Sequence, residues 1–169
     1  MQRPVSVTVF AVLNIVFGTM GFVAMIFSIV IMRVLPTTPD NPVLDIMRNS
    51  PGYATWMKIA LPLGFLATGV SVASGIGLLK LKSWGRLLAI GYAIYGIVAS
   101  LAGAVANYIF VMHPLMEQAS QKSGPEAAGL IGVAIGGTFG TCFGMILPVL
   151  LLFFMFRPNV VAAFRPAVE

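Results

Sequence analysis

The sequence predicts an all-α integral membrane protein, a four-helix bundle with short loops, and three observations support this fold class. Four long stretches contain no Asp, Glu, Lys, Arg or His; they cover residues 4–32, 59–79, 87–112 and 127–156. Each is long enough for a membrane helix, which needs about 20 apolar residues. Hydrophobic residues make up 59% of the 169 positions and charged residues only 9%. No polar stretch is left for a soluble domain, so residues 1–169 are predicted to form a single membrane domain.

The four spans are predicted at about residues 5–33, 55–80, 86–112 and 126–156. The N-terminus resembles a signal peptide, but its apolar run is about twice as long as a normal h-region, so we interpret it as a retained first span. Pro62 and Pro148 lie inside the second and fourth spans. Each removes a backbone hydrogen bond, which predicts a kink at both positions.

Two outer loops, at about 34–54 and 113–125, and an inner turn at about 80–86 connect the spans. In the first loop, Asn41 and Pro42 predict the start of a short helix that runs to about Asn49. In the second, a short helix is predicted from Pro114 to Lys122. Both loops are interpreted as solvated connectors, with a lid over the bundle as the alternative.

The distribution of Lys and Arg predicts that both termini are cytoplasmic. With this orientation, six basic residues lie inside: Arg3, Lys80, Lys82, Arg86, Arg157 and Arg165. Four lie outside: Arg33, Arg48, Lys58 and Lys122. The net charge is +5, but the basic residues are scattered at span ends and form no continuous basic surface. We therefore expect the lipid bilayer, and not nucleic acid, to be their partner.

The inner turn combines an interfacial tryptophan with three cations: Lys80, Lys82, Trp84 and Arg86. Aromatic side chains settle at headgroup level, and cations attract anionic lipid phosphates. The turn is predicted to anchor the topology. The alternative is a specific contact site for an anionic lipid or a partner protein.

The fourth span has a row of glycines at every fourth position: Gly132, Gly136, Gly140 and Gly144. Residues four apart lie on nearly the same face of a helix, so this row predicts a groove in which another helix can approach closely. Shorter rows occur in the second span, at Gly69, Ala73 and Gly77, and in the third, at Gly96, Ser100 and Ala104. The partner of the groove is either another span of this chain or a second molecule.

The polar residues inside the spans are few and uncharged, and the ones of most interest are Asn14, Ser71, Ser74, Thr138 and Thr141. We expect them to hydrogen bond between helices, which contributes about 0.6 kcal/mol per bond on average. A polar lining for a solute pathway is the alternative.

The spans lack the residues that proton-coupled transport, metal binding or catalysis would need. There is no intramembrane carboxylate of the kind that proton-coupled transporters use. The only histidine, His113, lies at the outer end of the third span, and no catalytic pair or phosphate loop is evident. No catalytic residue, metal site or cofactor is predicted, and the protein is not expected to be an enzyme.

Three segments resemble those of a loose set of uncharacterised bacterial four-span integral membrane proteins. They are the opening Arg3 to Val7, the segment Ser74 to Arg86 and the tail Arg157 to Phe164. The resemblance implies a bacterial cytoplasmic (inner) membrane and a compact four-helix bundle. It implies no activity and no catalytic residues.

Together these observations predict a non-enzymatic multi-pass membrane protein. Its helices would associate with themselves in a homo-oligomer, with a partner membrane protein or with lipid. The alternative is a small channel or carrier for a neutral or apolar solute.

Overall fold

The computed structural model describes residues 5–34 and 42–164, except for the side chains of Pro42, Thr138, Thr141 and Phe143. This part of the chain is all-α and contains no strand. Its elements are α1 (Val5–Val34), α2 (Pro42–Asn49), α3 (Pro51–Leu79), α4 (Ser83–Asn107), the π-helix η1 (Tyr108–Met112), α5 (His113–Ser120), α6 (Pro125–Met155) and α7 (Pro158–Ala163).

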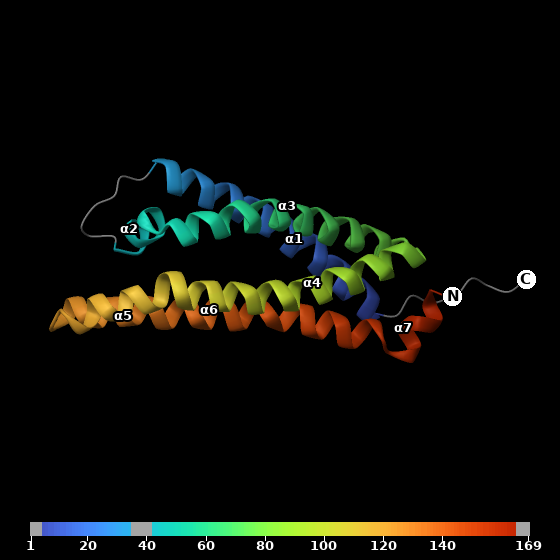
Figure 1. Cartoon of the computed structure of the whole chain (residues 1–169). Helices are drawn as coiled ribbons and strands as arrows, with labels where there is room; N and C mark the ends of the chain where they lie inside the picture. The colour runs from blue at the N-terminus through green and yellow to red at the C-terminus, as the bar shows by residue number, and fades with distance from the viewer. Residues whose placement is uncertain (1–4, 35–41, 165–169) are drawn as a thin grey trace, which may run out of the picture.

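Each long helix packs against the next long helix along the chain: α1 against α3, α3 against α4, and α4 against α6. Figure 1 shows two pairs, α1 with α3 and α4 with α6. The first and last long helices approach each other at the end where the short α3–α4 turn and α7 lie, and Phe10 of α1 packs there on Phe154 of α6 with ring centroids 4.8 Å apart. We call this the inner end, and the end with α2 and α5 the outer end.

Three of the described helices are long and apolar enough to cross a membrane: Val5–Val34, Pro51–Leu79 and the continuous helical segment Ser83–Ser120. The fourth predicted span coincides with α6, a helix of 31 residues. Within it, two shorter apolar stretches, Pro125–Gly137 and Gly144–Met155, flank the residues whose side chains are not described.

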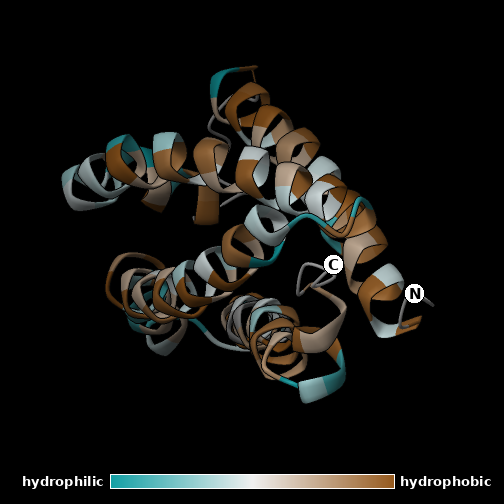
Figure 2. Ribbon diagram, turned by 90° about the vertical axis from the view of Figure 1, so that its right-hand side faces the viewer, coloured by the Kyte–Doolittle hydropathy of each residue, from teal (hydrophilic) through white to brown (hydrophobic). Residues whose placement is uncertain are grey.

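Large apolar side chains are exposed on all sides of the long helices. In α1, for example, Phe17, Phe22 and Phe27 are each 46% exposed or more. Figure 2 shows hydrophobic residues on the outward faces of the helices as well as on the inward ones. A helix that is apolar all round is typical of a lipid environment, because water would favour a polar outer face.

The second predicted span begins earlier than expected, at Pro51 instead of about residue 55. The Ser50 side chain accepts a hydrogen bond from the Tyr53 amide at 3.3 Å, and proline occupies the first helical position. Both features favour a helix N-terminus. Ser50 and Pro51, which directly follow α2, therefore start α3.

The third helix does not end at residue 112. It continues through η1 into α5, which corresponds to the short helix predicted from Pro114 to Lys122, and residues 121–124 connect α5 to α6. A proline normally clashes with the carbonyl four residues before it. Here the wider turn of η1, in which the His113 amide bonds to the Tyr108 carbonyl, lets the helix pass the proline.

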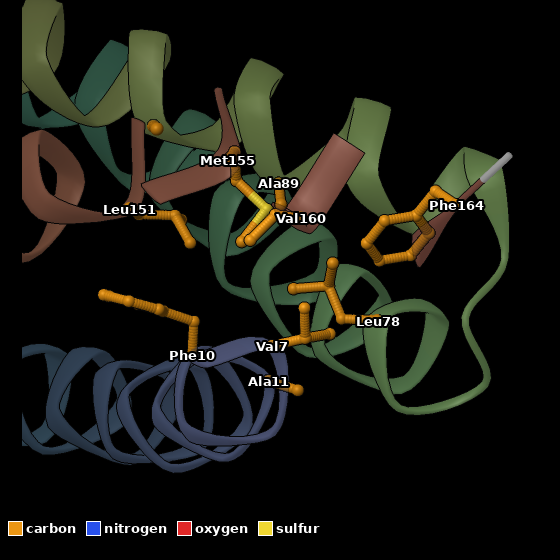
Figure 3. Packing of buried hydrophobic residues seen from close by; sticks show 10 residues of the cluster. Val7, Phe10, Ala11, Leu78, Ala89, Leu151, Met155, Val160 and Phe164 are labelled. Atoms are coloured by element: carbon orange, nitrogen blue, oxygen red, sulfur yellow. The ribbon is translucent and has the colours of Figure 1, made fainter. Parts of the chain in front are cut away.

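The inner-end core joins all the long helices and α7. Its buried residues are Val7, Phe10, Ala11, Leu78, Ala89, Ala93, Leu151, Met155, Val160 and Phe164. Figure 3 shows Val160 of α7 and Phe164, which directly follows α7, turned towards Val7 and Leu78. Because Val160 and Phe164 are buried in this core, α7 closes the inner end of the structure.

A second core lies at the outer end, where α2 bridges the two pairs. Ile46 packs there with Val111, Leu115, Ala119 and Leu130. The predicted helix from Pro42 to Asn49 is confirmed. Val43 and Met47 of α2 pack against this core from its edge.

Candidate functional site

Three of the predicted intramembrane polar residues meet where α1 crosses α3. The Asn14 amide donates to Ser74 Oγ at 3.0 Å, and Ser71 Oγ donates to the Asn14 carbonyl at 2.9 Å. Ser74 Oγ in turn donates to the Ser71 carbonyl at 2.8 Å. All three residues are fully buried. They therefore form a closed polar contact between two helices.

Small residues bring α1 and α3 close enough for these bonds. A Cβ atom added at Gly75 would lie 2.7 Å from the Ala11 carbonyl oxygen, and one at Gly18 would lie 2.8 Å from Val72 Cγ2. Neither position tolerates a side chain without movement of its neighbours. The α1–α3 contact thus combines small-residue packing with interhelical hydrogen bonds, the two main contributions to helix association in membranes.

One atom of the cluster is not satisfied. Asn14 Oδ1 is buried and has no hydrogen-bond partner in the described part of the structure. An unpaired buried acceptor costs about 1 to 3 kcal/mol. The cluster is therefore held together by fewer polar interactions than its composition allows.

Two further residues of the predicted polar set, Thr138 and Thr141, lie on α6. Their side chains are outside the described part of the structure. Asn14, Ser71 and Ser74, the other members of the set, form the closed contact between α1 and α3. The sequence identified these polar residues but could not show that they lie next to one another.

The glycine row of α6 is not used in packing within the described part of the chain. At Gly132, Gly136, Gly140 and Gly144, no described atom comes within 4 Å of the position where a Cβ atom would stand. The neighbouring apolar residues Ile131, Val133 and Phe139 are also exposed. The glycine row thus lies beside exposed apolar side chains and has no described packing partner.

Close packing inside the chain occurs at other glycines. Gly77 of α3 faces Gly85 of α4, and a Cβ atom added at Gly77 would lie 2.5 Å from Gly85 Cα. Gly96 of α4 faces Pro148 of α6, and a Cβ atom added at Gly96 would lie 2.8 Å from Pro148 Cγ. Gly77 and Gly96 belong to the two shorter predicted rows, whereas Gly85 was not identified. The very short turn between Gly77 and Gly85 was the feature of the sequence that could have indicated this contact.

The α3–α4 turn is a Schellman motif with leucine in place of the usual glycine. The Lys82 amide bonds to the Gly77 carbonyl at 3.0 Å, and the Leu81 amide to the Leu78 carbonyl at 3.1 Å. Leu81 has a φ of 52°, a conformation that disfavours side chains. Its side chain packs against the inner-end core, which offsets this cost. The motif fixes the direction in which α4 leaves α3.

The four residues of the predicted inner-turn site have different roles. Lys80 and Lys82 are exposed, and the Trp84 ring lies over Gly77. Arg86 is half-buried, and its Nε donates to the carbonyl of Met155, the last residue of α6, at 3.2 Å. At the outer end, Arg48 of α2 donates to the Met32 carbonyl near the end of α1. Both arginines satisfy carbonyls that a helix C-terminus leaves unpaired.

The Arg86 contact leads to a prediction. Arg86→Ala is expected to lower the free energy of unfolding by about 1 kcal/mol, because the Met155 carbonyl loses a charged donor. Thermal unfolding in detergent micelles, followed by circular dichroism, measures this effect. Lys82→Ala removes an exposed cation from the same turn and serves as the control, with an expected change below about 0.5 kcal/mol. Equal effects of the two variants would contradict the capping role of Arg86.

Two ion pairs lie at the outer end, each between residues four apart in the sequence. Lys122 pairs with Glu126 at 3.1 Å, and His113 Nδ1 lies 3.8 Å from Glu117; all four side chains are largely exposed. Among the described residues, no group of three or more His, Cys, Asp or Glu side chains could hold a metal ion. His113 and Glu117 lie one turn apart on α5, whereas Lys122 precedes α6 and reaches Glu126 in its first turn, so both pairs are exposed local contacts.

The fold and these contacts define the class: an all-α protein with helices suited to crossing a membrane and with close helix contacts built on small residues. No protein-family model, curated protein or solved structure matches the chain.

Proposed function

We propose that the chain is a non-enzymatic multi-pass protein of the bacterial cytoplasmic membrane that acts by association of its helices. In this proposal α1, α3, α4 and α6 each cross the bilayer and form a four-helix bundle, and both termini are cytoplasmic. The length and apolar character of α1, α3 and the α4 segment support the membrane location. The charges Lys80, Lys82 and Arg157 at the inner end support the orientation.

The open glycine row of α6 carries the association part of the proposal. Gly132, Gly136, Gly140 and Gly144 have no described packing partner, although they would allow a very close helix contact. A second helix packed in this groove would make continuous van der Waals contact along it, which flexible lipid tails do not. We propose that the groove is filled by α6 of a second copy of the chain, which gives a homo-oligomer.

Leucine at both Gly136 and Gly140 tests this proposal. The double variant is expected to lose the oligomer and to keep its thermal stability, because no described atom lies near either position. Helix propensity also favours leucine over glycine by somewhat less than 1 kcal/mol per residue. Native mass spectrometry from lipid nanodiscs gives the subunit number, and circular dichroism gives the unfolding temperature.

Gly91→Leu is the matched control. Gly91 is an exposed glycine of α4 that also has no described atom within 4 Å of an added Cβ, but it lies outside the α6 row. This variant should keep the oligomer. The proposal of self-association through α6 would be contradicted if the wild-type protein were monomeric, or if the double variant kept the same subunit number.

The contacts give less support to the alternative of a solute pathway. Asn14, Ser71 and Ser74, which would line it, are fully buried in the α1–α3 contact. Two grooves of about 240 and 540 Å³ lie along α3 and α4, and none of the predicted polar residues lines them. Association is therefore the function that the geometry favours.

A further inference from the structure

A groove of about 790 Å³ lies at the inner end, where α6 turns into α7. Its apolar wall consists of Val149, Leu152 and Phe153 from the last turns of α6 and of Phe156, which directly follows α6. Its polar end is formed by Arg157, in the α6–α7 turn, and by Asn159, in the first turn of α7. The groove is therefore amphipathic along its length, with the cation at the place where α6 would leave the membrane.

Arg157 packs on aromatic rings, and no described acid pairs with it. Its guanidinium carbon lies 5.0 Å from the ring centroids of both Phe153 and Phe154. Phe154 is itself fixed by its ring contact with Phe10. Stacking of this kind orients the guanidinium and leaves its N–H donors available for an anion. The side chain is exposed, so an anion can reach it.

The described carboxylates are all far from this groove. Asp45, Glu117 and Glu126 lie in α2, in α5 and at the start of α6, which are at the outer end (Figure 1). The described cations of the inner end, Lys80, Lys82, Arg86 and Arg157, thus have no described carboxylate at their end. Lys80, Lys82 and Arg157 are exposed, so an anion from the surroundings can approach this end.

We infer that this α6–α7 groove binds an anionic phospholipid. The phosphate accepts hydrogen bonds from Arg157 and lies beside Asn159, and one acyl chain lies along Val149, Phe153 and Phe156. The charge selects an anionic over a zwitterionic headgroup, and the apolar wall selects a lipid over a free anion. The inference rests on the proposed membrane insertion and names the lipid partner, but it does not depend on the glycine row of α6.

Native mass spectrometry of the full chain tests it, with nanodiscs that contain phosphatidylcholine and phosphatidylglycerol. The wild-type protein is expected to retain phosphatidylglycerol in preference to phosphatidylcholine. Arg157→Gln should lower this retention about fivefold, which corresponds to about 1 kcal/mol for one cation. Arg157→Lys keeps the charge and should restore most of the retention. Equal retention by the wild-type protein and Arg157→Gln would overturn the inference.

Further variants separate the groove from the rest of the inner end. Val149→Trp fills the apolar wall without changing the charge and should also reduce retention; full retention would show that no acyl chain lies there. The double variant Lys80→Gln, Lys82→Gln should keep the lipid, and a loss as large as that of Arg157→Gln would place the site at the α3–α4 turn instead. Displacement of the lipid by inorganic phosphate would indicate a free-anion site and would also overturn the inference.

The same spectra distinguish this inference from the proposed self-association. If the wild-type protein forms an oligomer but does not retain phosphatidylglycerol, the lipid inference fails and the proposed self-association stands. If it is a monomer that retains phosphatidylglycerol, self-association fails and the lipid inference stands.

Discussion

Gly85→Ala is expected to lower the free energy of unfolding by about 3 kcal/mol, at the upper end of the range for overpacked positions. An added Cβ atom would lie 2.6 Å from Gly77 Cα and 2.7 Å from the Leu78 amide nitrogen. Both are backbone atoms, so no side-chain rotation can relieve the clash. The Schellman motif that ends α3 fixes the two helices on either side of the contact, so the turn itself must open.

Unfolding of the purified protein by sodium dodecyl sulfate in mixed micelles, followed by circular dichroism, measures this change. Gly91→Ala is the control, because it makes the same substitution in the same helix at a position with no described atom within 4 Å. It should keep or slightly raise the stability, since alanine has the higher helix propensity. Equal stabilities of the two variants would show that the Gly77–Gly85 contact is not tight.

Asn14→Asp is expected to cost about 3 kcal/mol, the value found for a carboxylate in the middle of a membrane helix. The substitution preserves the shape of the side chain but replaces the amide donor that bonds to Ser74 Oγ. The Ser74 hydroxyl can donate to the new oxygen only by giving up its bond to the Ser71 carbonyl. Asn14 is fully buried, and no described cation takes part in its hydrogen bonds.

Asn14→Ala, in contrast, is expected to cost less than about 1 kcal/mol. It loses the bond to Ser74 but also removes Oδ1, which has no described partner. The bond from Ser71 to the backbone carbonyl of residue 14 remains. The two variants are compared by the same detergent unfolding, and a larger loss for alanine than for aspartate would contradict the assignment of Asn14 to a closed interhelical contact.

The short segments show how far local sequence signals reach. Pro42 to Asn49 was predicted as a helix and forms one, because the preference of proline for the first helical position is a local signal. The short helix predicted from Pro114 to Lys122 is present as α5, but the local sequence did not indicate that it continues the third span through the π-helix η1. Packing of α5 against α6 and of Leu115 in the outer core stabilises the continued helix, and neither contact is visible in the local sequence.

The candidate sites show the same limit. The sequence singled out Asn14, Ser71 and Ser74 but could not place them on one crossing of α1 and α3. It grouped Arg86 with Lys80 and Lys82, although Arg86 caps α6. It did not single out the groove beside Arg157, because that groove forms only when α7 folds back onto the inner core.

The sequence by itself determined that the chain is all-α and suited to a membrane. Charge-free stretches of more than 20 residues are a local property, and a helix is the structure that satisfies their backbone in lipid. Only the tertiary structure decided which small residues pack inside the chain, at Gly75, Gly77 and Gly85, and which remain open, in the row that begins at Gly132. The physical reason is that helices apolar on all sides carry no hydrophobic stripe to show which face is buried. Their mutual orientation is set by short-range packing and a few hydrogen bonds, which depend on three-dimensional fit.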